Sequence, residues 1–260
     1  MGAKQYDKYL DHWKVDLYEQ TVTETEDVQM INKLLGTRTR QRIFEVACGS
    51  GRILVPLAKA GHVMTGLDMD NLMLAKLFEK TQGLENITIV QADAVTANWG
   101  EGYDVVILAG NILLNIVSDD DYKATQQKFI QKAYSALKPD GYMYLDNNAF
   151  AHPERFFGLP GEHVIFEGTD SWGTYGRYIL ANEKYDTQKQ LVTGTRRYEL
   201  TLKSGETFSK EERYVKHVPT VQQMEQWIVD VGFTIEQRYG SYKGDSVSET
   251  THRAIYWAKK

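Results

Sequence analysis

Between Arg42 and about Asn148, short runs rich in β-branched residues alternate with segments whose apolar residues recur every three or four positions. Runs of the first kind, such as "ITIVQAD" and "YDVVILAG", are typical of buried strands, and segments of the second kind are typical of amphipathic helices. Strands that alternate with helices along a chain usually form a parallel sheet that is covered by helices on both faces. The sequence therefore predicts an open α/β sheet over this region.

The segment after Phe150 has a different pattern. Stretches such as "GRYILANEKYD" and "QLVTGTRRYELTL" alternate apolar and polar residues, which is typical of an antiparallel sheet with one face in water. The chain then returns to a helix, "TVQQMEQWIVDVGF", and to two closing strands. We expect residues 1–40 to form an N-terminal helical cap, residues 41–149 and 218–260 an α/β core, and residues 150–217 an inserted antiparallel lid.

The charge and hydropathy of the chain limit the classes of partner that it can bind. The 260 residues carry a net charge of −5 with scattered Lys and Arg, which does not provide the cationic surface that a phosphate backbone requires. The longest apolar runs fall short of the roughly 18 residues of a membrane span, and the start "MGAKQYDKYL" has no secretory pattern. We expect a cytoplasmic protein with a small-molecule substrate, no nucleic-acid or membrane partner, and a homodimer as one candidate assembly.

The stretch "EVACGSG" places Gly49 and Gly51 between a strand and a helical pattern. Such a turn lets the backbone approach a ligand and directs N–H groups toward negative charge. A dinucleotide-binding loop would have a third glycine where this chain has Leu54. Glu45, inside the apolar run before the turn, would repel a diphosphate and suits a cation such as an ammonium group. The alternative is a simple strand-to-helix turn.

Acidic residues end the next two predicted strands, Asp68 after "HVMTGL" and Asp93 after "ITIVQA". The carboxyl ends of parallel strands meet at the edge where open α/β sheets bind ligands. A carboxylate at the position of Asp68 can accept hydrogen bonds from both ribose hydroxyls. The pattern predicts a ligand with an amino acid head, a ribose and an exocyclic amine, without phosphate. A second interpretation of Asp68 is an N-terminal cap of the following helix.

These residues resemble the class I S-adenosylmethionine-dependent methyltransferases. "EVACGSG" is similar to the first motif of that family, "GLDMDNLML" to the second and "QADA" to the third, and "YDVVILAGN" and "LKPDGYMYLD" follow in the same order. The late sheet insertion and "GFTIEQRYGSY" resemble the small-molecule branch, which includes glycine-type and amino-sugar N-methyltransferases. The resemblance implies a Rossmann-like, seven-stranded, mostly parallel sheet and S-adenosylmethionine as the cofactor.

The resemblance also implies how the cofactor is held. The implied contacts are Glu45 and the backbone around Ala47, Gly49 and Gly51 with the methionine portion, Asp68 with the ribose, and Asp93, Ala94 and Met69 with the adenine. Many members of the family have glycine at the position of Ala47. Tyr6 and Tyr9, on the first predicted helix, are candidates to close the opposite side of the site.

Candidate catalytic residues are His217, Tyr214 and Arg197 on the predicted lid and Asn111 after the fourth strand of the sheet. Methyl transfer from a sulfonium mainly requires that the lone pair of the acceptor be aligned with the C–S bond. An amine must also arrive uncharged, which a nearby base or a desolvating pocket can ensure. The competing interpretation is that the tyrosines and the histidine are packing residues of the lid.

Asp146 and Asn147, at the end of the fifth strand, resemble two ligands of the metal-dependent catechol type of methyltransferase. The fourth strand ends in "LAGN", which offers Asn111 but no carboxylate, and Mg²⁺ prefers carboxylate and water ligands. The single cysteine, Cys48, excludes a disulfide within the chain and a multi-thiolate metal site. We therefore predict that the protein needs no metal.

The sequence thus predicts an S-adenosylmethionine-dependent methyltransferase that acts on a small molecule, with an amine nitrogen as the acceptor. An O-methyltransferase acting on a hydroxyl or a carboxylate is the alternative with the same chemistry. A regulatory protein that binds the cofactor without turnover and an RNA methyltransferase are alternatives from other classes.

Overall fold

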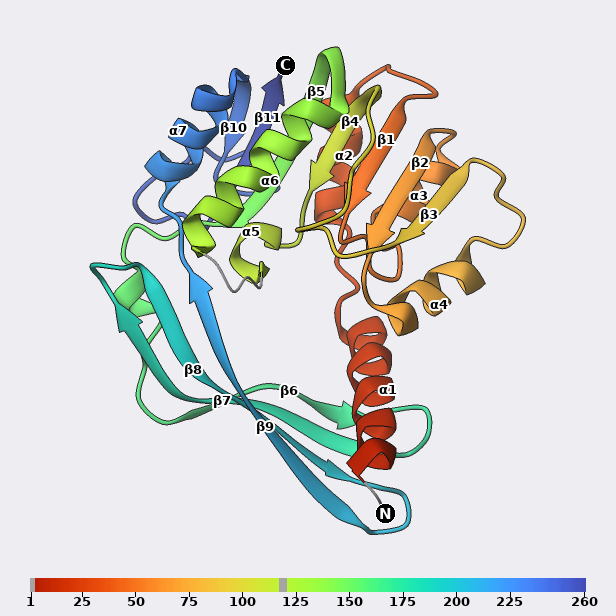
Figure 1. Ribbon diagram of the computed structural model, residues 1–260, viewed down its shortest axis with the longest axis vertical. Helices are drawn as coiled ribbons and strands as arrows, with labels where there is room; N and C mark the ends of the chain where they lie inside the picture. Colours follow the sequence, from red (N-terminus) through yellow and green to blue (C-terminus); the bar gives the residue numbers. More distant parts are fainter. Residues whose placement is uncertain (1–2, 117–120) are drawn as a thin grey trace. The chain divides into compact units, whose positions relative to one another are not determined.

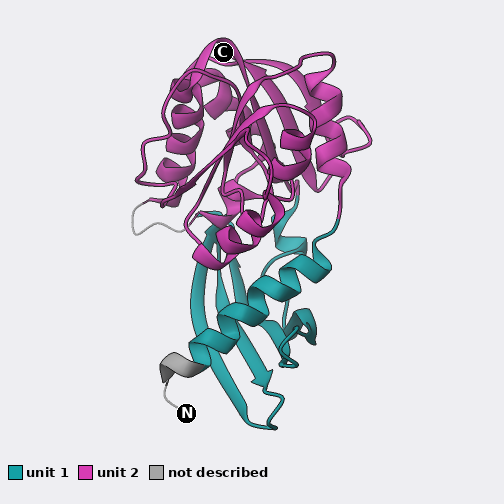
Figure 2. Cartoon of the chain, turned by 90° about the vertical axis from the view of Figure 1, so that its right-hand side faces the viewer, with its two compact units in different colours: residues 1–23, 152–217 teal, residues 24–151, 218–260 magenta. Residues whose placement is uncertain are grey.

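The computed structural model describes residues 3–116 and 121–260, and the chain divides into two compact units (Figure 2). Unit 1 consists of residues 1–23 and 152–217, and unit 2 consists of residues 24–151 and 218–260. Among the described residues, no helix is both long enough and apolar enough to cross a membrane.

Unit 2 contains a seven-stranded sheet with the strand order β10-β11-β5-β4-β1-β2-β3 (Figure 1). Only β11 runs antiparallel to its neighbours, β5 and β10. The predicted Rossmann-like, mostly parallel sheet is therefore confirmed. The strands are β1 (Arg42–Val46), β2 (Val63–Asp68), β3 (Ile87–Gln91), β4 (Tyr103–Leu108), β5 (Leu137–Asn148), β10 (Thr234–Tyr239) and β11 (Arg253–Lys259).

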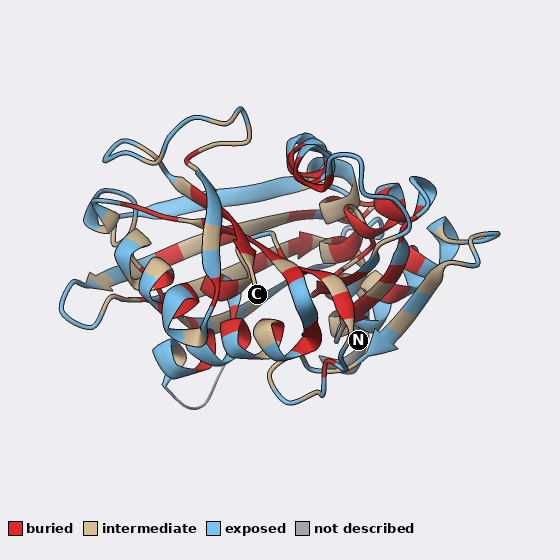
Figure 3. Ribbon diagram, turned by 90° about the horizontal axis from the view of Figure 1, so that it is seen from above, coloured by how far each residue is buried: buried red, intermediate tan, exposed pale blue. Residues whose placement is uncertain are grey.

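Helices cover both faces of this sheet. On one face, α2 (Glu26–Leu35), α3 (Leu54–Lys59) and α4 (Asn71–Lys80) share a core with the inward side chains of the strands. On the other face, α5 (Ile112–Asn115), α6 (Tyr122–Ala136) and α7 (Val221–Val231) form a second core. As a result, the central strands are buried and the outer sides of the helices are exposed (Figure 3). Because helices bury both faces of the sheet, its central strands are nearly continuous runs of apolar residues in the sequence.

The strand order indicates at which edge of the sheet a ligand would bind. β1 lies between β2 and β4, so the chain moves to one side of β1 for β2 and β3 and then crosses to the other side for β4. In open α/β sheets, ligands bind outside the carboxyl ends of the strands at such a switch point. The glycine loop after β1 lies at this position.

Unit 1 is built on a four-stranded antiparallel sheet in the order β6-β7-β8-β9, as predicted from the alternating pattern. α1 packs on this sheet through Leu10, Trp13 and Leu17, which share a core with Tyr198 and Leu200. The elements are α1 (Ala3–Thr21), the 3-10 helix η1 (Pro153–Arg155), β6 (Glu162–Thr169), β7 (Tyr175–Asp186), β8 (Leu191–Thr201) and β9 (Thr207–His217).

The structure divides the expected N-terminal cap between the two units. α1 belongs to unit 1, whereas α2 belongs to unit 2. The indole of Trp13 rests on Gly176 of β7, where a Cβ atom would approach the ring to 2.4 Å, and its Nε1 donates a hydrogen bond to the Gly168 carbonyl at 3.0 Å. Gly176 has no side chain, so the Trp13 indole can pack directly on the backbone of β7. This contact holds α1 against the antiparallel strands.

Candidate active site

The loop after β1 turns sharply because three of its residues have left-handed backbone angles. Ala47, Gly49 and Gly51 have φ values of 55°, 52° and 83°. A Cβ atom on Gly51 would lie 2.4 Å from the Cδ1 atom of Leu77, so only glycine fits there. Ala47 adopts an angle that costs a residue with a Cβ atom about 1–2 kcal/mol, which marks the loop as strained.

Asp68, at the end of β2, fastens this loop. Its Oδ2 accepts a hydrogen bond from the Gly49 amide at 2.8 Å, and its Oδ1 accepts one from the Asp70 amide at 2.9 Å. The cap of α4 is Asp70, whose Oδ1 accepts hydrogen bonds from the amides of Leu72 and Met73 at 2.9 and 3.2 Å. The interpretation of Asp68 as the helix cap is therefore corrected, because the cap lies two residues later.

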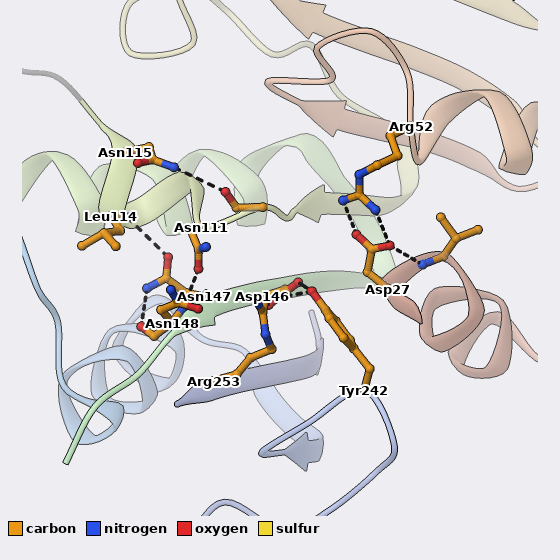
Figure 4. Close-up of polar contacts among 12 residues, drawn as sticks. Asp27, Arg52, Asn111, Leu114, Asn115, Asp146, Asn147, Asn148, Tyr242 and Arg253 are labelled. Carbon is orange, nitrogen blue, oxygen red and sulfur yellow. Dashed lines mark hydrogen bonds and ion pairs between the residues drawn. The ribbon is translucent and has the colours of Figure 1, made fainter. Parts of the chain in front are cut away.

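Glu45 lies on β1 with only 4% of its surface exposed, and its Oε2 has no hydrogen-bond partner among the described residues. Burial raises the pKa of this carboxyl well above its ordinary value, although Arg52 opposes the shift. The Arg52 guanidinium is itself bound to both carboxylate oxygens of the buried Asp27, with one bond of 2.6 Å (Figure 4). Glu45 therefore retains the capacity to accept a cation.

A cavity of about 260 Å³ lies at the carboxyl ends of β1, β2 and β3. Asp68 and Asp93 supply its charged groups, while Ile112 and Phe129 from the helical side supply apolar surface. Such a mixture suits a flat ring joined to a polyhydroxyl group. The cavity is lined by Ala47, Leu67, Asp68, Met69, Ala92, Asp93, Ala94, Val95, Ile112, Asn115, Ile116 and Phe129. Five predicted cofactor residues thus line one cavity.

Lys132 on α6 supports the loop that carries Asp93 and Ala94, and sequence reasoning missed it. Its Nζ donates hydrogen bonds to the carbonyls of Ala94, Val95 and Ala97 at 2.6, 3.1 and 2.7 Å. One lysine therefore satisfies three carbonyls of a loop that has no strand partner. The sequence could have indicated this role only through the position of Lys132 on the side of the predicted helix that faces the sheet.

Amide side chains connect the ends of β4 and β5 (Figure 4). Asn111 has a left-handed φ of 63°, and its Oδ1 accepts a hydrogen bond from the Asn148 amide at 2.6 Å. Asn147 accepts one from the Leu114 amide at 3.3 Å, and Asn115 donates to the Gly110 carbonyl at 3.4 Å. The network holds Asn111 next to the edge at which the glycine loop lies.

Asp146 is fully buried, and its carboxylate is held by other side chains. It accepts hydrogen bonds from the Tyr242 hydroxyl at 2.5 Å and from Arg253, which also donates to the Tyr242 oxygen at 2.8 Å. Burial raises the pKa of Asp146, and Arg253 opposes the shift. Residues 3–116 and 121–260 contain no group of three or more His, Cys, Asp or Glu side chains arranged to hold a metal. The independence from metal stays a prediction.

Two candidate residues of the lid have partners within unit 1. Arg197 binds Glu162 through Nη1 and Nη2 at 2.8 and 2.6 Å and Glu199 through Nε at 2.9 Å. Tyr214 donates a hydrogen bond to Glu183, and burial is the first cause of its raised pKa. Arg197 is thus engaged in surface ion pairs, whereas Tyr214 faces the buried side of the sheet.

The remaining candidates also belong to unit 1. His217 is buried at the end of β9. Tyr6 donates a hydrogen bond to Glu206 at 2.6 Å, and Tyr9 packs edge-on against Trp172 with 5.8 Å between the ring centroids. Their assignment to the cofactor and to catalysis stays a prediction. In unit 2, by contrast, the predicted residues at the ends of β1, β2 and β3 lie close together.

Comparisons with known proteins agree with this geometry. Residues 43–141 match the family described as "Methyltransferase domain". The chain is 25% identical over 260 residues to a glycine/sarcosine N-methyltransferase of Aphanothece halophytica, covering 97% of this chain and 88% of that protein. It is 30% identical over 124 residues to a ubiquinone biosynthesis O-methyltransferase of Histophilus somni (strain 2336), covering 45% of this chain and 49% of that protein.

Among solved structures, the fold is similar to the crystal structure of an S-adenosylmethionine-dependent methyltransferase from Clostridium acetobutylicum ATCC 824. The TM-score is 0.73 at 17% sequence identity, and the match covers 98% of each chain. The similarity therefore includes both the parallel and the antiparallel sheet.

Asp68→Ala is expected to weaken binding of S-adenosylmethionine by about 1.5–3 kcal/mol, the usual loss for hydrogen bonds to a charged group. Asp70→Ala is the matched control, because it removes the cap of α4 and lowers the free energy of unfolding by about 1 kcal/mol without touching the Gly49 amide. Calorimetric titration and urea unfolding measure the two effects. Equal affinities for the two variants would contradict the role of Asp68.

Glu45→Gln is expected to change stability and affinity in opposite directions. A carboxyl whose pKa is raised in the folded state stabilises the fold below its unfolded pKa of about 4.3, and this contribution is lost as the pH rises through the folded value. The variant should therefore be more stable than the parent at pH 7 in the absence of ligand, with a difference that vanishes near pH 4. Because a neutral amide cannot balance an ammonium group, its affinity for S-adenosylmethionine should fall by about 1.5–3 kcal/mol.

Urea unfolding at pH 4 and pH 7 tests the predicted gain in stability, and calorimetry at pH 7 tests the predicted loss of affinity. If the variant were less stable at pH 7, or bound the ligand as tightly as the parent, Glu45 would not be the unpaired carboxylate that accepts the cation.

Proposed function

We propose that this chain, a methyltransferase with the class I fold and a methyltransferase domain at residues 43–141, transfers the methyl group of S-adenosylmethionine to an amine nitrogen of a small molecule. The buried Oε2 atom of Glu45, which has no hydrogen-bond partner among the described residues, carries the cofactor part of this proposal. The side chains at the ends of β4 and β5 support the choice of an amine acceptor.

The residues of unit 2 fit the cofactor. Glu45 offers a carboxylate to its ammonium group, and Asp68 retains lone pairs for ribose hydroxyls beyond the two that its backbone partners use. The apolar walls of the cavity suit the adenine ring, and Asp93 and Ala94 are among the residues that line it. The cofactor, when bound, supplies an electrophilic methyl group.

The groups near Asn111 can orient an amine but cannot readily deprotonate an alcohol. The amide oxygen of Asn111 has a second lone pair besides the one used by the Asn148 amide, and so it can accept an N–H from the acceptor. An amine that donates its N–H groups to carbonyl oxygens keeps its lone pair free for the methyl group. A hydroxyl acceptor would instead need a general base, and Asp146 is bound to Arg253 and Tyr242.

The relatives support the same choice. The N-methyltransferase relative covers 97% of this chain, so the similarity extends through both units. The O-methyltransferase relative covers 45% of the chain, and similarity over part of a chain carries less information about the acceptor. Glycine-type amines are therefore the first acceptors to test.

Asn111→Gly tests the role of the amide without adding backbone strain, because glycine adopts the φ of 63° freely. We expect it to lower kcat by about 10²-fold, as the loss of an orienting polar group can do, and to leave the affinity for S-adenosylmethionine unchanged. The parent is first incubated with labelled cofactor and pooled metabolites, and mass spectrometry identifies the methylated products.

Amines should gain the label and compounds with hydroxyls alone should not. Label on hydroxyl or carboxylate oxygens would favour the O-methyltransferase instead. Binding of the cofactor without any labelled product would favour a regulatory protein.

A further inference from the structure

The loop of residues 93–97 follows β3 and lines the cavity with Asp93, Ala94 and Val95. The Oδ1 atom of Asp93 accepts a hydrogen bond from the Val95 amide at 2.8 Å, and the Asp93 carbonyl accepts one from the Ala97 amide at 2.8 Å. These amides are therefore used within the loop. The carbonyl groups of the loop need donors from elsewhere, because a backbone carbonyl without a partner is costly when it is buried.

Lys132 supplies these donors from α6. Its Nζ atom lies within 3.1 Å of three carbonyl oxygens, which belong to Ala94, Val95 and Ala97. An ammonium group has three N–H donors, so the three carbonyls use all of them. A neutral amine has one N–H fewer and no charge to strengthen its hydrogen bonds. The loop is therefore held completely only when Lys132 is charged.

Two aromatic residues place Lys132 against the loop. Trp99 donates a hydrogen bond from Nε1 to the Ala94 carbonyl at 3.0 Å, and the Nζ atom of Lys132 lies 4.8 Å from the centroid of the Trp99 ring. Phe129 packs edge-on against Trp99, with 5.3 Å between the ring centroids, and it also lines the cavity. Residues three apart share one face of a helix. One face of α6 thus supplies, through Phe129 and Lys132, a wall of the cavity and the cation that holds the loop.

We propose that Lys132 is a positioning residue of the cofactor site, whose charged form holds the loop of residues 93–97 in the conformation that binds the adenine ring of S-adenosylmethionine. This inference rests on the proposed function, because that function places the adenine ring in this cavity. Lys132 acts on the ring through the loop. The identity of the methylated acceptor has no part in this role.

The charge of Lys132 changes within the pH range that binding experiments can reach. Burial lowers the pKa of Lys132 to about 8, Lys128 lowers it further, and Asp93 opposes the shift. Binding of adenine requires the loop conformation that the ammonium form favours, so binding raises this pKa and takes up a proton. Affinity is therefore highest below this pKa and falls as the pH rises through about 8.

Lys132→Met tests the proposal with two ligands that share the adenosine part. The demethylated cofactor has an amino acid head, and 5′-methylthioadenosine does not. At pH 7 the variant should bind both ligands more weakly by the same factor, roughly 10- to 100-fold, as expected when hydrogen bonds to a charged group are lost. Glu45→Gln should weaken only the demethylated cofactor, because 5′-methylthioadenosine has no ammonium group. Calorimetric titration measures all these affinities.

Lys128→Met is the matched control. Lys128 is exposed on α6, one turn before Lys132. The variant should keep the affinities of the parent at pH 7, where Lys132 is charged in both proteins. Because Lys128 helps to lower the pKa of Lys132, the fall in affinity should move to higher pH in this variant. Urea unfolding confirms that each variant is folded in the titrations.

The pH dependence distinguishes a positioning role from a purely structural one. 5′-Methylthioadenosine has no group that titrates near pH 8, so its titration between pH 7 and pH 9 reports on the protein. The parent should lose affinity over this range and should take up protons on binding, which calorimetry in buffers of different ionisation enthalpy measures. Lys132→Met should show neither effect.

The outcomes separate this inference from the proposed function. Weaker binding of both ligands to Lys132→Met, together with loss of the pH dependence, supports the inference whichever acceptor is methylated. Equal affinities of the parent and Lys132→Met, or a pH dependence that Lys132→Met retains, would overturn the inference and leave the proposed function intact. Binding of neither ligand to the parent would overturn both.

Discussion

The buried Oε2 atom of Glu45, which has no hydrogen-bond partner among the described residues, is the constraint on which the site depends. A buried polar atom without a partner costs about 1–3 kcal/mol, and more when it is charged. Arg52 is the nearby cation that could remove this cost, but both oxygens of Asp27 hold it. Because the start of α2 binds the arginine, the carboxylate at the end of β1 remains available. The sequence therefore maintains an unfavourable group at the switch point of the sheet, which is typical of a binding site.

Asp68 couples the glycine loop to the next strand, so the loop after β1 and the end of β2 are not independent. Its hydrogen bond to the Gly49 amide crosses from β2 to the loop after β1. The Cys48 amide adds a second link by donating a hydrogen bond to the Leu67 carbonyl at 3.0 Å. An acidic residue at the end of β2 thus fixes the backbone of the glycine loop through the Gly49 amide. Lys132 has a comparable role for the loop that carries Asp93.

The sequence predicted the sheet, the switch-point loop and the strand-end residues because these follow from periodicity and from the position of glycines and acids at strand ends. It did not predict that α1 and α2 would belong to different units, since an apolar stripe does not reveal which sheet it packs against. The catalytic roles of Arg197, Tyr214 and His217 stay predictions, because alternation along a strand identifies two faces of a sheet but does not say which face is covered. Asp70 was overlooked as a helix cap beside the more prominent Asp68.

Two buried carboxylates of the same sheet show how structural and functional acids differ. Glu45 and Asp146 both have raised pKa values because they are buried. Asp146 binds Arg253 and Tyr242 from the segment that closes the chain, so its burial ties β5 to β11 and to the loop before it. Glu45 has no such side-chain partner for its Oε2. Both residues are buried carboxylates, so what distinguishes them is that Arg253 binds Asp146 whereas the Oε2 atom of Glu45 has no hydrogen-bond partner among the described residues.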